Sequence, residues 1–249
     1  MKTSSNTALL LLFFLLCSVS FSGLKAQEEV RRNFIQLTPL GILFGNIDLQ
    51  YERGFGKAFS GSIAISPKVS GGIIRVRGLD SPTVITTDFE FTGFHITPEF
   101  RYYILQTDQR YTGLYTGVYY RFKKAKDDIV GVYNSETTGT SSPIDVDVDF
   151  FSHTFGVELG YKLPIGKRWF IDFLVAGPGY SVGDFDITEN QPLPPEFYDD
   201  IAAAIVDNYQ ALADWLRERN FDFEQRDKDA VGNFRLPAFR YAVKLSFSF

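Results

Sequence analysis

Apolar and polar residues alternate one by one in several stretches between residue 34 and the C-terminus. In the final stretch, FRYAVKLSFSF, every second residue from Phe239 to Phe249 is aromatic or aliphatic. Because successive side chains of a β-strand point to opposite faces, this period of two predicts a strand with one apolar face. The pattern recurs and predicts eight strands, at about 34–43, 47–55, 58–70, 89–105, 111–122, 151–163, 169–182 and 235–249.

The connections between the predicted strands alternate in length. Tight turns are predicted at 54–57, 106–109 and 164–167, on the side of the two termini, whereas the connections after the third, fifth and seventh strands are long. Short periplasmic turns, longer extracellular loops and two periplasmic termini are typical of outer-membrane β-barrels. The first strand is the least regular, because Pro39 and the glycines at 41 and 45 interrupt its alternation.

The two faces of each predicted strand differ in a way that favours a membrane barrel. In the strand at 89–105, Phe94 and Ile96 share one face, and His95, Thr97 and Glu99 share the other. Small and charged residues together suit the narrow lumen of an eight-stranded barrel, and a continuous apolar face suits lipid. Aromatic rings are then expected near the membrane interfaces, at Tyr51, Tyr102, Tyr120, Tyr161, Trp169 and Tyr241.

The first 26 residues have the pattern of a secretory signal peptide. Lys2 precedes an apolar run at 8–17, and Ala26 is a small residue at the expected cleavage position. Ten residues are too short to cross a hydrocarbon core of roughly 30 Å as a helix. Cys17 would suit a lipoprotein, but the bulky Leu16 before it does not. We therefore expect a signal peptide at 1–26 and an outer-membrane β-barrel at 27–249.

The composition of the chain argues against several classes of function. The chain has one Cys, inside the predicted signal peptide, so structural disulfides are not expected in the rest. The formal net charge is −5 and no basic cluster is present, which argues against nucleic acid as a partner. No later stretch has the roughly 18 apolar residues of a membrane helix. Glycine-rich phosphate loops and dinucleotide fingerprints are also missing, so no cofactor is expected.

With the signal peptide and the eight amphipathic strands, the segments PLGILFGNIDLQYERGFG and RYAVKLSFSF complete a pattern that resembles the small eight-stranded outer-membrane barrels of the OmpA/OmpX-like family. The resemblance implies an all-β, eight-stranded antiparallel up-and-down transmembrane β-barrel with a long helix-containing extracellular loop. It also implies a location in the cell outer membrane, in contact with lipid and lipopolysaccharide. In that family the terminal residues, here Phe249, Phe247 and Leu245, form a signal for the barrel-assembly machinery. The fold hosts many activities, so it does not name one.

Charged residues on the predicted inner face are nearly balanced in sign. They form a predicted lumen charge network of Asp48, Glu52, Lys68, Glu99, Arg101, Arg121, Glu158, Lys162, Asp172, Arg240 and Lys244. Because buried charges need partners, near balance predicts a salt-bridged plug. A narrow pore or a polar ion pathway is the alternative.

A lipid A-modifying enzyme is a second alternative, since some barrels of this size carry such activity. His95, Thr97 and Glu99 point the same way, but into the lumen, where an acyl ester has no easy entry. His153 and the adjacent Ser152 point to opposite faces. We expect no catalytic residues, and a structural or surface-interaction role.

Three aspartates, Asp145, Asp147 and Asp149, share one side of an extended segment. Carboxylate oxygens are what Ca²⁺ prefers, but side chains on a strand diverge rather than converge on one ion. Together with Asp127, Asp128 and Glu136 of the same predicted loop, they are expected to form a solvated acidic extracellular surface without a metal site. A divalent bridge to lipopolysaccharide phosphates is the alternative.

The longest predicted loop, 183–234, contains a helix at about 196–219. Pro194 and Pro195 precede acidic residues, and arginines follow at the other end, as the helix dipole favours. One face carries an interaction stripe of Ile201, Ile205, Tyr209, Leu212, Trp215 and Leu216. The helix either folds over the barrel as a lid or offers this stripe to a partner. A protein in the outer membrane or outside the cell is the expected partner, and the outer leaflet of the membrane is the other.

Overall fold

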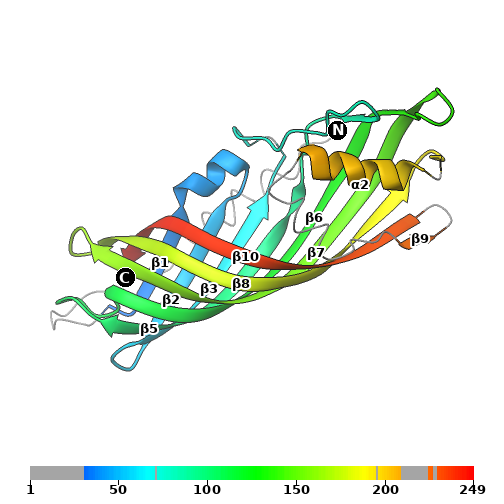
Figure 1. Ribbon diagram of the computed structural model, residues 1–249. Helices are drawn as coiled ribbons and strands as arrows, with labels where there is room; N and C mark the ends of the chain where they lie inside the picture. The colour runs from blue at the N-terminus through cyan, green and yellow to red at the C-terminus, as the bar shows by residue number, and fades with distance from the viewer. Residues whose placement is uncertain (1–30, 71, 195, 209–223, 227–228) are drawn as a thin grey trace, which may run out of the picture. The chain divides into compact units, whose positions relative to one another are not determined.

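The computed structural model of the protein describes residues 31–70, 72–194, 196–208, 224–226 and 229–249. The predicted signal peptide lies outside these residues. From Arg31 onward the chain forms one compact unit, which is almost entirely β-structure (Figure 1).

Eight antiparallel strands form a closed ring, in which each strand pairs with its neighbours in the sequence. The ring closes because β1 pairs with both β2 and β10. This confirms the predicted all-β ring of eight strands. They are β1 (Asn33–Thr38), β2 (Asp48–Phe55), β3 (Phe59–Lys68), β5 (Thr92–Leu105), β6 (Gly113–Asn134), β7 (Ser141–Pro164), β8 (Trp169–Glu189) and β10 (Asp229–Ser248). Two short strands lie off the ring: β4 (Val84–Thr86) pairs with β6, and β9 (Glu224–Arg226) pairs with β10.

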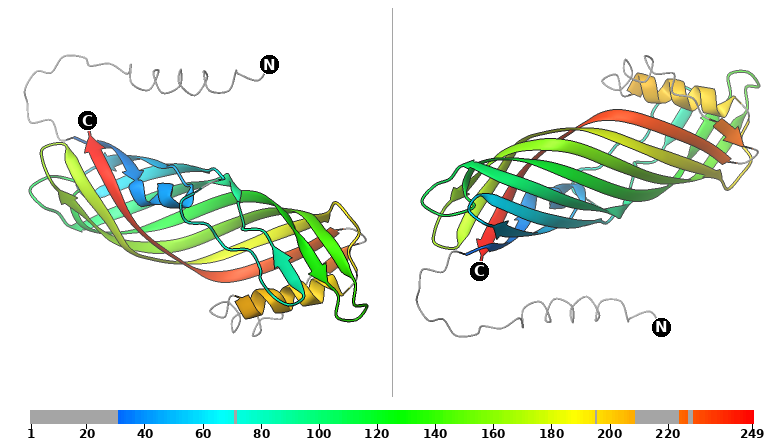
Figure 2. Two further views of the ribbon diagram at one scale, coloured as in Figure 1. Left: turned by 90° about the horizontal axis from the view of Figure 1, so that it is seen from above. Right: turned by 90° about the horizontal axis from the view of Figure 1, so that it is seen from below.

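The two ends of the ring differ. The start of β1, the end of β10 and the short turns after β2, β5 and β7 lie at one end, called here the terminal end (Figure 2). The only α-helix of the described residues, α2 (Phe197–Asn208), lies at the other end, called the helix end. A 3₁₀ helix, η1 (Pro39–Phe44), follows the short strand β1 and begins with the proline that interrupts the sequence pattern.

The register staggers the strands strongly around the ring. Successive cross-strand partners, starting from β1, are Leu37, Leu49, Ile65, Ile96, Phe122, His153, Val182 and Arg235. Leu37 itself pairs with Leu245, so one circuit advances ten residues along β10. Strands of such a ring are strongly tilted, and an eight-stranded ring leaves an interior only wide enough for side chains.

Four strands are longer than predicted. The predicted long connection between the fifth and sixth strands is wrong, because β6 continues to Asn134 and β7 begins at Ser141. The turn between them covers only 135–140, where Gly139 has a φ of 67° and donates a hydrogen bond to Ser135. Likewise β8 extends to Glu189 and β10 starts at Asp229, so the predicted loop 183–234 shrinks to 190–228.

Around the terminal half of the ring, the outer face is apolar and the inner face is polar. On β7, Phe155, Val157 and Leu159 are exposed, whereas Thr154 and Glu158 between them are buried. The other strands repeat this pattern, so exposed aliphatic and aromatic side chains encircle the ring. This surface is called here the belt. It includes the aromatic residues predicted for the interfaces, Tyr51, Tyr102, Tyr120, Tyr161, Trp169 and Tyr241.

Toward the helix end, β6, β7, β8 and β10 continue past the belt, and the polarity of their faces reverses. This part, called here the extension, covers 124–134, 141–151, 184–189 and 229–235, with β4 at its edge. Its outer face carries Lys124, Lys126, Asp128, Asp145, Asp147, Asp149, Asp184 and Asp186, together with exposed Val130 and Val132. Its inner face is a hydrophobic core of Leu79, Val84, Tyr133, Ile144, Val146, Phe185, Ile187 and Phe234, completed by Phe197, Tyr198 and Ala204 of α2.

Helix α2 is held to the extension by its first turn. Phe197 and Tyr198 are buried, and the ring of Phe197 meets that of Tyr133 edge-on at 5.4 Å. The hydroxyl of Tyr133 donates to Asp200, and Ser135 donates to Glu196. The helix begins one residue from its predicted start, and the segment 209–219 of the predicted helix lies outside the described residues. Within the described part of the chain, no helix has the length and apolarity to cross a membrane.

Candidate functional site: the charged lumen

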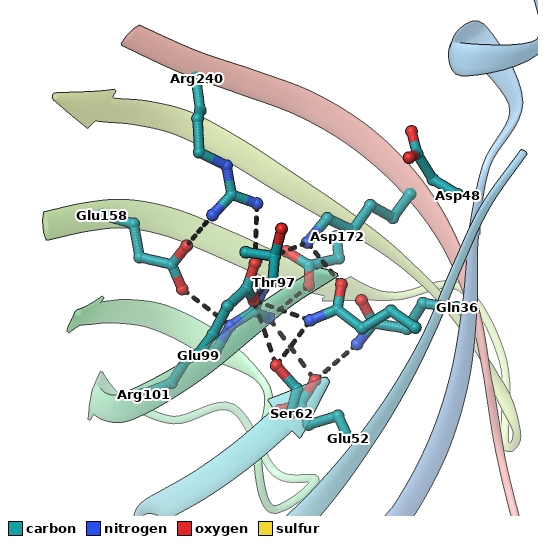
Figure 3. Close-up of polar contacts among 12 residues, drawn as sticks. Gln36, Asp48, Glu52, Ser62, Thr97, Glu99, Arg101, Glu158, Asp172 and Arg240 are labelled. Carbon is teal, nitrogen blue, oxygen red and sulfur yellow. Dashed lines mark hydrogen bonds and ion pairs between the residues drawn. The ribbon is translucent and has the colours of Figure 1, made fainter. Parts of the chain in front are cut away.

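The lumen is organised around Arg101 of β5, whose side chain is fully buried. Its guanidinium donates to Glu99 at 2.6 Å, to Asp172 at 2.7 Å and to Glu158 at 2.9 Å, and it lies 3.5 Å from Glu52 (Figure 3). These carboxylates come from β5, β8, β7 and β2, so one arginine links opposite walls of the ring. These carboxylates point into the lumen because inward positions recur at every second residue of a strand.

Three further cations surround this hub. Lys162 donates to Glu52 at 2.5 Å, and Arg240 donates to Glu99 at 2.7 Å and lies 3.6 Å from Glu158. Lys244 lies 3.8 Å from Glu99. The network therefore contains four carboxylates and four cations, and this balance is what allows charges to remain ionised away from water.

Neutral side chains, which the predicted charge network did not include, complete the network. Gln36 and Tyr103 donate to Glu52, Tyr115 donates to Asp172, and Gln50 donates to Glu99 while accepting from Lys244. Each sits on the inward face of its strand, so its position in the alternation was the available signal. The predicted network included only the charged residues of these faces.

An aromatic cluster lies in the lumen toward the terminal end. Phe34, Tyr103, Tyr111, Tyr115 and Phe170 are all at most 2 % exposed. Their rings pack at centroid distances between 5.5 and 6.5 Å. Lys162 also lies over the ring of Phe34 at 4.2 Å, a cation–π contact that joins this cluster to the charge network.

Gly54 makes room for this aromatic cluster. A Cβ atom at this position would lie 2.4 Å from the ring of Tyr111, which is too close for any side chain. The Tyr111 hydroxyl donates to the Gly56 carbonyl at 2.7 Å, and its backbone has a positive φ of 61°. The turn after β5 is thereby fixed so that one tyrosine covers the end of the lumen.

Three predicted members of the lumen network lie outside it. Asp48 pairs with His95 at 3.3 Å, and Arg121 donates to Thr97 at 3.2 Å. Lys68 is half-buried, and no carboxylate of the described residues forms an ion pair with it. The other eight residues, Glu52, Glu99, Arg101, Glu158, Lys162, Asp172, Arg240 and Lys244, belong to the network.

The side chains weighed for catalysis point to separate partners. His95 contacts Asp48, Thr97 accepts from Arg121, and Glu99 contacts Arg101 and Arg240. Among the described residues, no hydrogen bond joins these three into a relay. His153 lies on the outer face of β7, where its ring stacks on Tyr120 and accepts or donates a 2.6 Å hydrogen bond.

The aspartates of β7 face outward in the extension. Asn190 donates to Asp145 at 3.0 Å and to Asp147 at 3.2 Å. Over the residues that the structure describes, no group of three or more His, Cys, Asp or Glu side chains could hold a metal ion. Asp145 and Asp147 thus bind a side-chain amide of the chain itself.

The predicted acidic loop is corrected in two respects. Asp127 and Asp128 belong to strand β6, and only Glu136 lies in a turn. Asp127 is also not a surface residue, because it faces inward and is 8 % exposed. Burial raises the pKa of its carboxyl, which accepts a hydrogen bond from the Glu90 backbone at 2.8 Å. Asp127 is thus part of the wall of the extension.

The remaining predicted sites lie at opposite ends. Phe247 and Leu245 face outward on β10, and the Phe249 backbone donates to the Asn33 carbonyl at 3.0 Å. In the predicted stripe of α2, Ile201 is partly buried against the extension core. The side chain of Ile205, and all of Tyr209, Leu212, Trp215 and Leu216, lie outside the described residues. The helix anchors Phe197 and Tyr198 were not predicted.

Comparison with known proteins adds one similarity. Residues 81–191 match the family model described as "Protein of unknown function (DUF3575)". The matched range runs from just before β4 to just beyond β8, and so includes three of the four long strands of the extension. No match is found among the curated proteins or among the solved structures.

Proposed function

We propose that the protein is a non-enzymatic integral membrane β-barrel of the outer membrane, with a sealed lumen and an extracellular extension that supports α2. The proposal rests on one observation, the reversal of polarity along β6, β7, β8 and β10. Inside the ring the buried face is charged and the exposed face is apolar; in the extension the buried face is apolar and the exposed face is largely charged.

A single solvent does not explain this reversal. In water, the belt would leave a ring of apolar side chains exposed around the whole molecule, which soluble monomers avoid. In lipid, the outer aspartates of the extension would be strongly unfavourable. The belt on β7 runs from Phe155 to Leu163, which fits the roughly 9–11 tilted residues that a membrane strand needs.

The connections support one orientation. Short turns gather at the terminal end, whereas the extension and α2 lie at the helix end. Outer-membrane barrels keep short turns and both termini in the periplasm. We therefore place the terminal end in the periplasm and the extension outside the cell, as in the OmpA/OmpX-like barrels that the sequence resembles.

The lumen supports a sealed barrel more than a pore. The aromatic cluster blocks the terminal end, and the balanced charge network fills the centre. We infer a structural or surface-interaction role, in contact with lipopolysaccharide and assembled by the barrel-assembly machinery. In planar bilayers the purified protein should show no steady conductance, and a large stable conductance would exclude the sealed lumen.

Cysteine labelling of intact cells tests location and orientation together. Three single-cysteine variants sample the three zones: Asp186→Cys in the extension, Val157→Cys in the belt and Asp108→Cys in a turn of the terminal end. All three wild-type side chains are exposed, and the chain has no other cysteine beyond Cys17.

A membrane-impermeant maleimide should label Asp186→Cys on intact cells and Asp108→Cys only after the outer membrane is permeabilised. Val157→Cys should react only after denaturation, because lipid covers it. Labelling of Val157→Cys in the native protein would contradict membrane insertion. Labelling of Asp108→Cys, but not Asp186→Cys, on intact cells would reverse the orientation.

A further inference from the structure

Three cations line the inner wall of the ring above the charge network, toward the helix end. Lys68 lies on β3, and Arg121 and Lys123 lie on the inward face of β6. Lys123 pairs across the sheet with His95, which in turn pairs with Ser66, two residues before Lys68. Arg121 and Lys123 are two residues apart on β6 and so share its inward face. The three residues thus lie on one stretch of the inner wall, spanning β3 to β6, and are called here the cation cluster.

The cation cluster lacks the close ion pairs that the central network has. Among the described residues, no ion pair joins Lys68, Arg121 or Lys123 to a carboxylate within 4.0 Å. Asp48, which contacts His95 at 3.3 Å, and Glu99 attract Arg121 from a longer distance, without a close ion pair. Among the described residues, the Arg121 side chain donates its only hydrogen bond to the neutral hydroxyl of Thr97. Positive charge is thus in excess on this part of the wall.

The cluster is also partly exposed to solvent. Its three side chains are half-buried, in contrast to the fully buried Arg101 and Lys162 of the central network. Like charges that are partly withdrawn from water repel each other and lose hydration, and an anion would offset both effects. Guanidinium and ammonium donors are the groups with which proteins bind phosphate and carboxylate oxygens.

We propose that this outer half of the lumen binds a phosphate-type oxyanion, held by Lys68, Arg121 and Lys123. Three cations around one space suit a dianion better than a single carboxylate. The inference goes beyond the proposed function, because it needs only the folded ring.

Two sources could supply the phosphate, since the wall of the ring has a weak seam nearby. β1 and β10 pair over four residues only, from Phe34–Ser248 to Leu37–Leu245, and η1 then replaces β1. Among the described residues, no backbone hydrogen bond joins η1 to β10, and Phe239 and Tyr241 beside it are 64 % and 79 % exposed. Through this seam, solvent could deliver free phosphate, or lipid could present a phosphate headgroup. The second route rests on the proposed function.

Calorimetry on the purified, detergent-solubilised barrel tests the site with inorganic phosphate and with dodecyl phosphate. Saturable binding of phosphate is expected, and Arg121→Gln and Lys123→Gln should each weaken it by about tenfold or more. Lys124→Gln is the matched control, because Lys124 is the next residue of β6 and is exposed on the outer face. It should leave the affinity unchanged. Tighter binding of dodecyl phosphate than of phosphate would identify lipid as the source, and equal binding would identify free phosphate.

Stability without ligand gives a second, independent readout. Removing one of three mutually repelling charges should raise the midpoint of urea unfolding, so Lys123→Gln is expected to be more stable than the wild type. Lys162→Gln should be less stable, because Lys162 is paired with Glu52. The proposal is overturned if phosphate does not bind saturably, or if Lys124→Gln weakens binding as much as Lys123→Gln. Failure of the labelling experiment above would leave the phosphate result intact and remove only the lipid route.

Discussion

The extension continues four strands of the ring, but the buried and exposed faces of the two regions have opposite polarity. Along the inner face of β7, Lys162, Glu158 and Thr154 lie in the ring, and Val146 and Ile144 follow in the extension. The alternation of side chains continues without a break between them. What changes is which face is apolar, and the change occurs at about the same level on β6, β7, β8 and β10. Alternation therefore defines a strand, whereas the polarity of its faces reports the surrounding medium.

The comparison also shows two ways to fill an interior. The ring is filled by ion pairs that stabilise only as a complete set, since each charge depends on its partners. The extension is filled by apolar side chains, whose contributions are more nearly independent. The loss of stability that a substitution causes should consequently differ between the two regions, both in magnitude and in how far it spreads through the molecule.

Arg101→Met should have the largest effect. It leaves four buried carboxylates without their shared cation, which is expected to destabilise the barrel by at least about 3–5 kcal/mol. A loss of heat-modifiable electrophoretic mobility and a lower midpoint of urea unfolding would show this destabilisation. Arg53→Met, on the exposed outer face of β2, is the matched control and should be near neutral. Adding Asp172→Asn to Arg101→Met should restore part of the loss, and an unchanged Arg101→Met protein would show that the network is dispensable.

Phe197→Ala should have the next largest effect, confined to the extension. Truncating a fully buried phenylalanine costs about 3–5 kcal/mol, so α2 should detach and become sensitive to proteases. Among the described residues of the ring, Leu236 packs against this core, but the charge network does not, so the ring should still fold. Asp199→Ala, in the same turn but exposed, should leave protease resistance unchanged.

Deleting Pro194 to Asn220 extends the same test. Membrane insertion and heat-modifiable folding should survive the deletion, because the charge network and the belt lie outside the deleted segment. If the deletion abolishes assembly of the barrel, the extension core is required for folding and the two regions are not independent.

Val157→Arg and Val130→Arg compare the outer surfaces directly. Both valines point outward and are about equally exposed, at 53 % and 45 %. In the belt, an arginine should cost about 2–4 kcal/mol in a lipid bilayer. In the extension it should change stability by less than about 0.5 kcal/mol, and it would face Asp145 across the sheet. Urea unfolding in vesicles measures both, and equal costs would contradict the assignment of the two surfaces.

The sequence predicted the ring better than the extension, for a physical reason. The period of two is local, so each strand could be found from its own residues, including β10 from Phe239 to Phe249. The predicted strands stopped near Phe122, Phe151 and Val182, where the apolar face changes sides. Alternation continues in IDVDVDF, but without a lipid-like face it resembled a loop. Tertiary pairing of β6 with β7 decides the matter, and such pairing is not local.

The sequence predicted which charged residues face the lumen, but not which of them contact one another. Charged inward residues such as Glu52 and Arg101 could be identified from alternation alone. Their grouping could not, because the stagger of the ring decides which inward residues share a level. Asp48 and Arg121 consequently belong to a different layer from Glu52. Tyr111 was missed because it lies in a turn, where alternation gives no direction.

Tyr133→Phe should have the smallest effect and the most specific one. Tyr133 is fully buried, and its hydroxyl donates to Asp200 of α2 at 2.6 Å. Burial, and then this hydrogen bond, raise the pKa of Tyr133 from about 10 to about 12. The folded state thus favours the neutral phenol, so its contribution to stability is complete below pH 10 and is lost as the pH rises toward 12.

Removing the hydroxyl should cost about 1 kcal/mol at pH 8 and should abolish the part of the alkaline destabilisation that belongs to Tyr133. Protease resistance of α2 at pH 8 and pH 11 measures both quantities. The wild type should lose resistance between these values more than Tyr133→Phe does, and Tyr180→Phe, which removes an exposed outward hydroxyl, should behave like the wild type. Identical pH profiles for the wild type and Tyr133→Phe would show that α2 is held by Phe197 and its apolar neighbours alone. In that case the extension would resemble an ordinary soluble core still more closely, and the ring alone would depend on buried polar contacts.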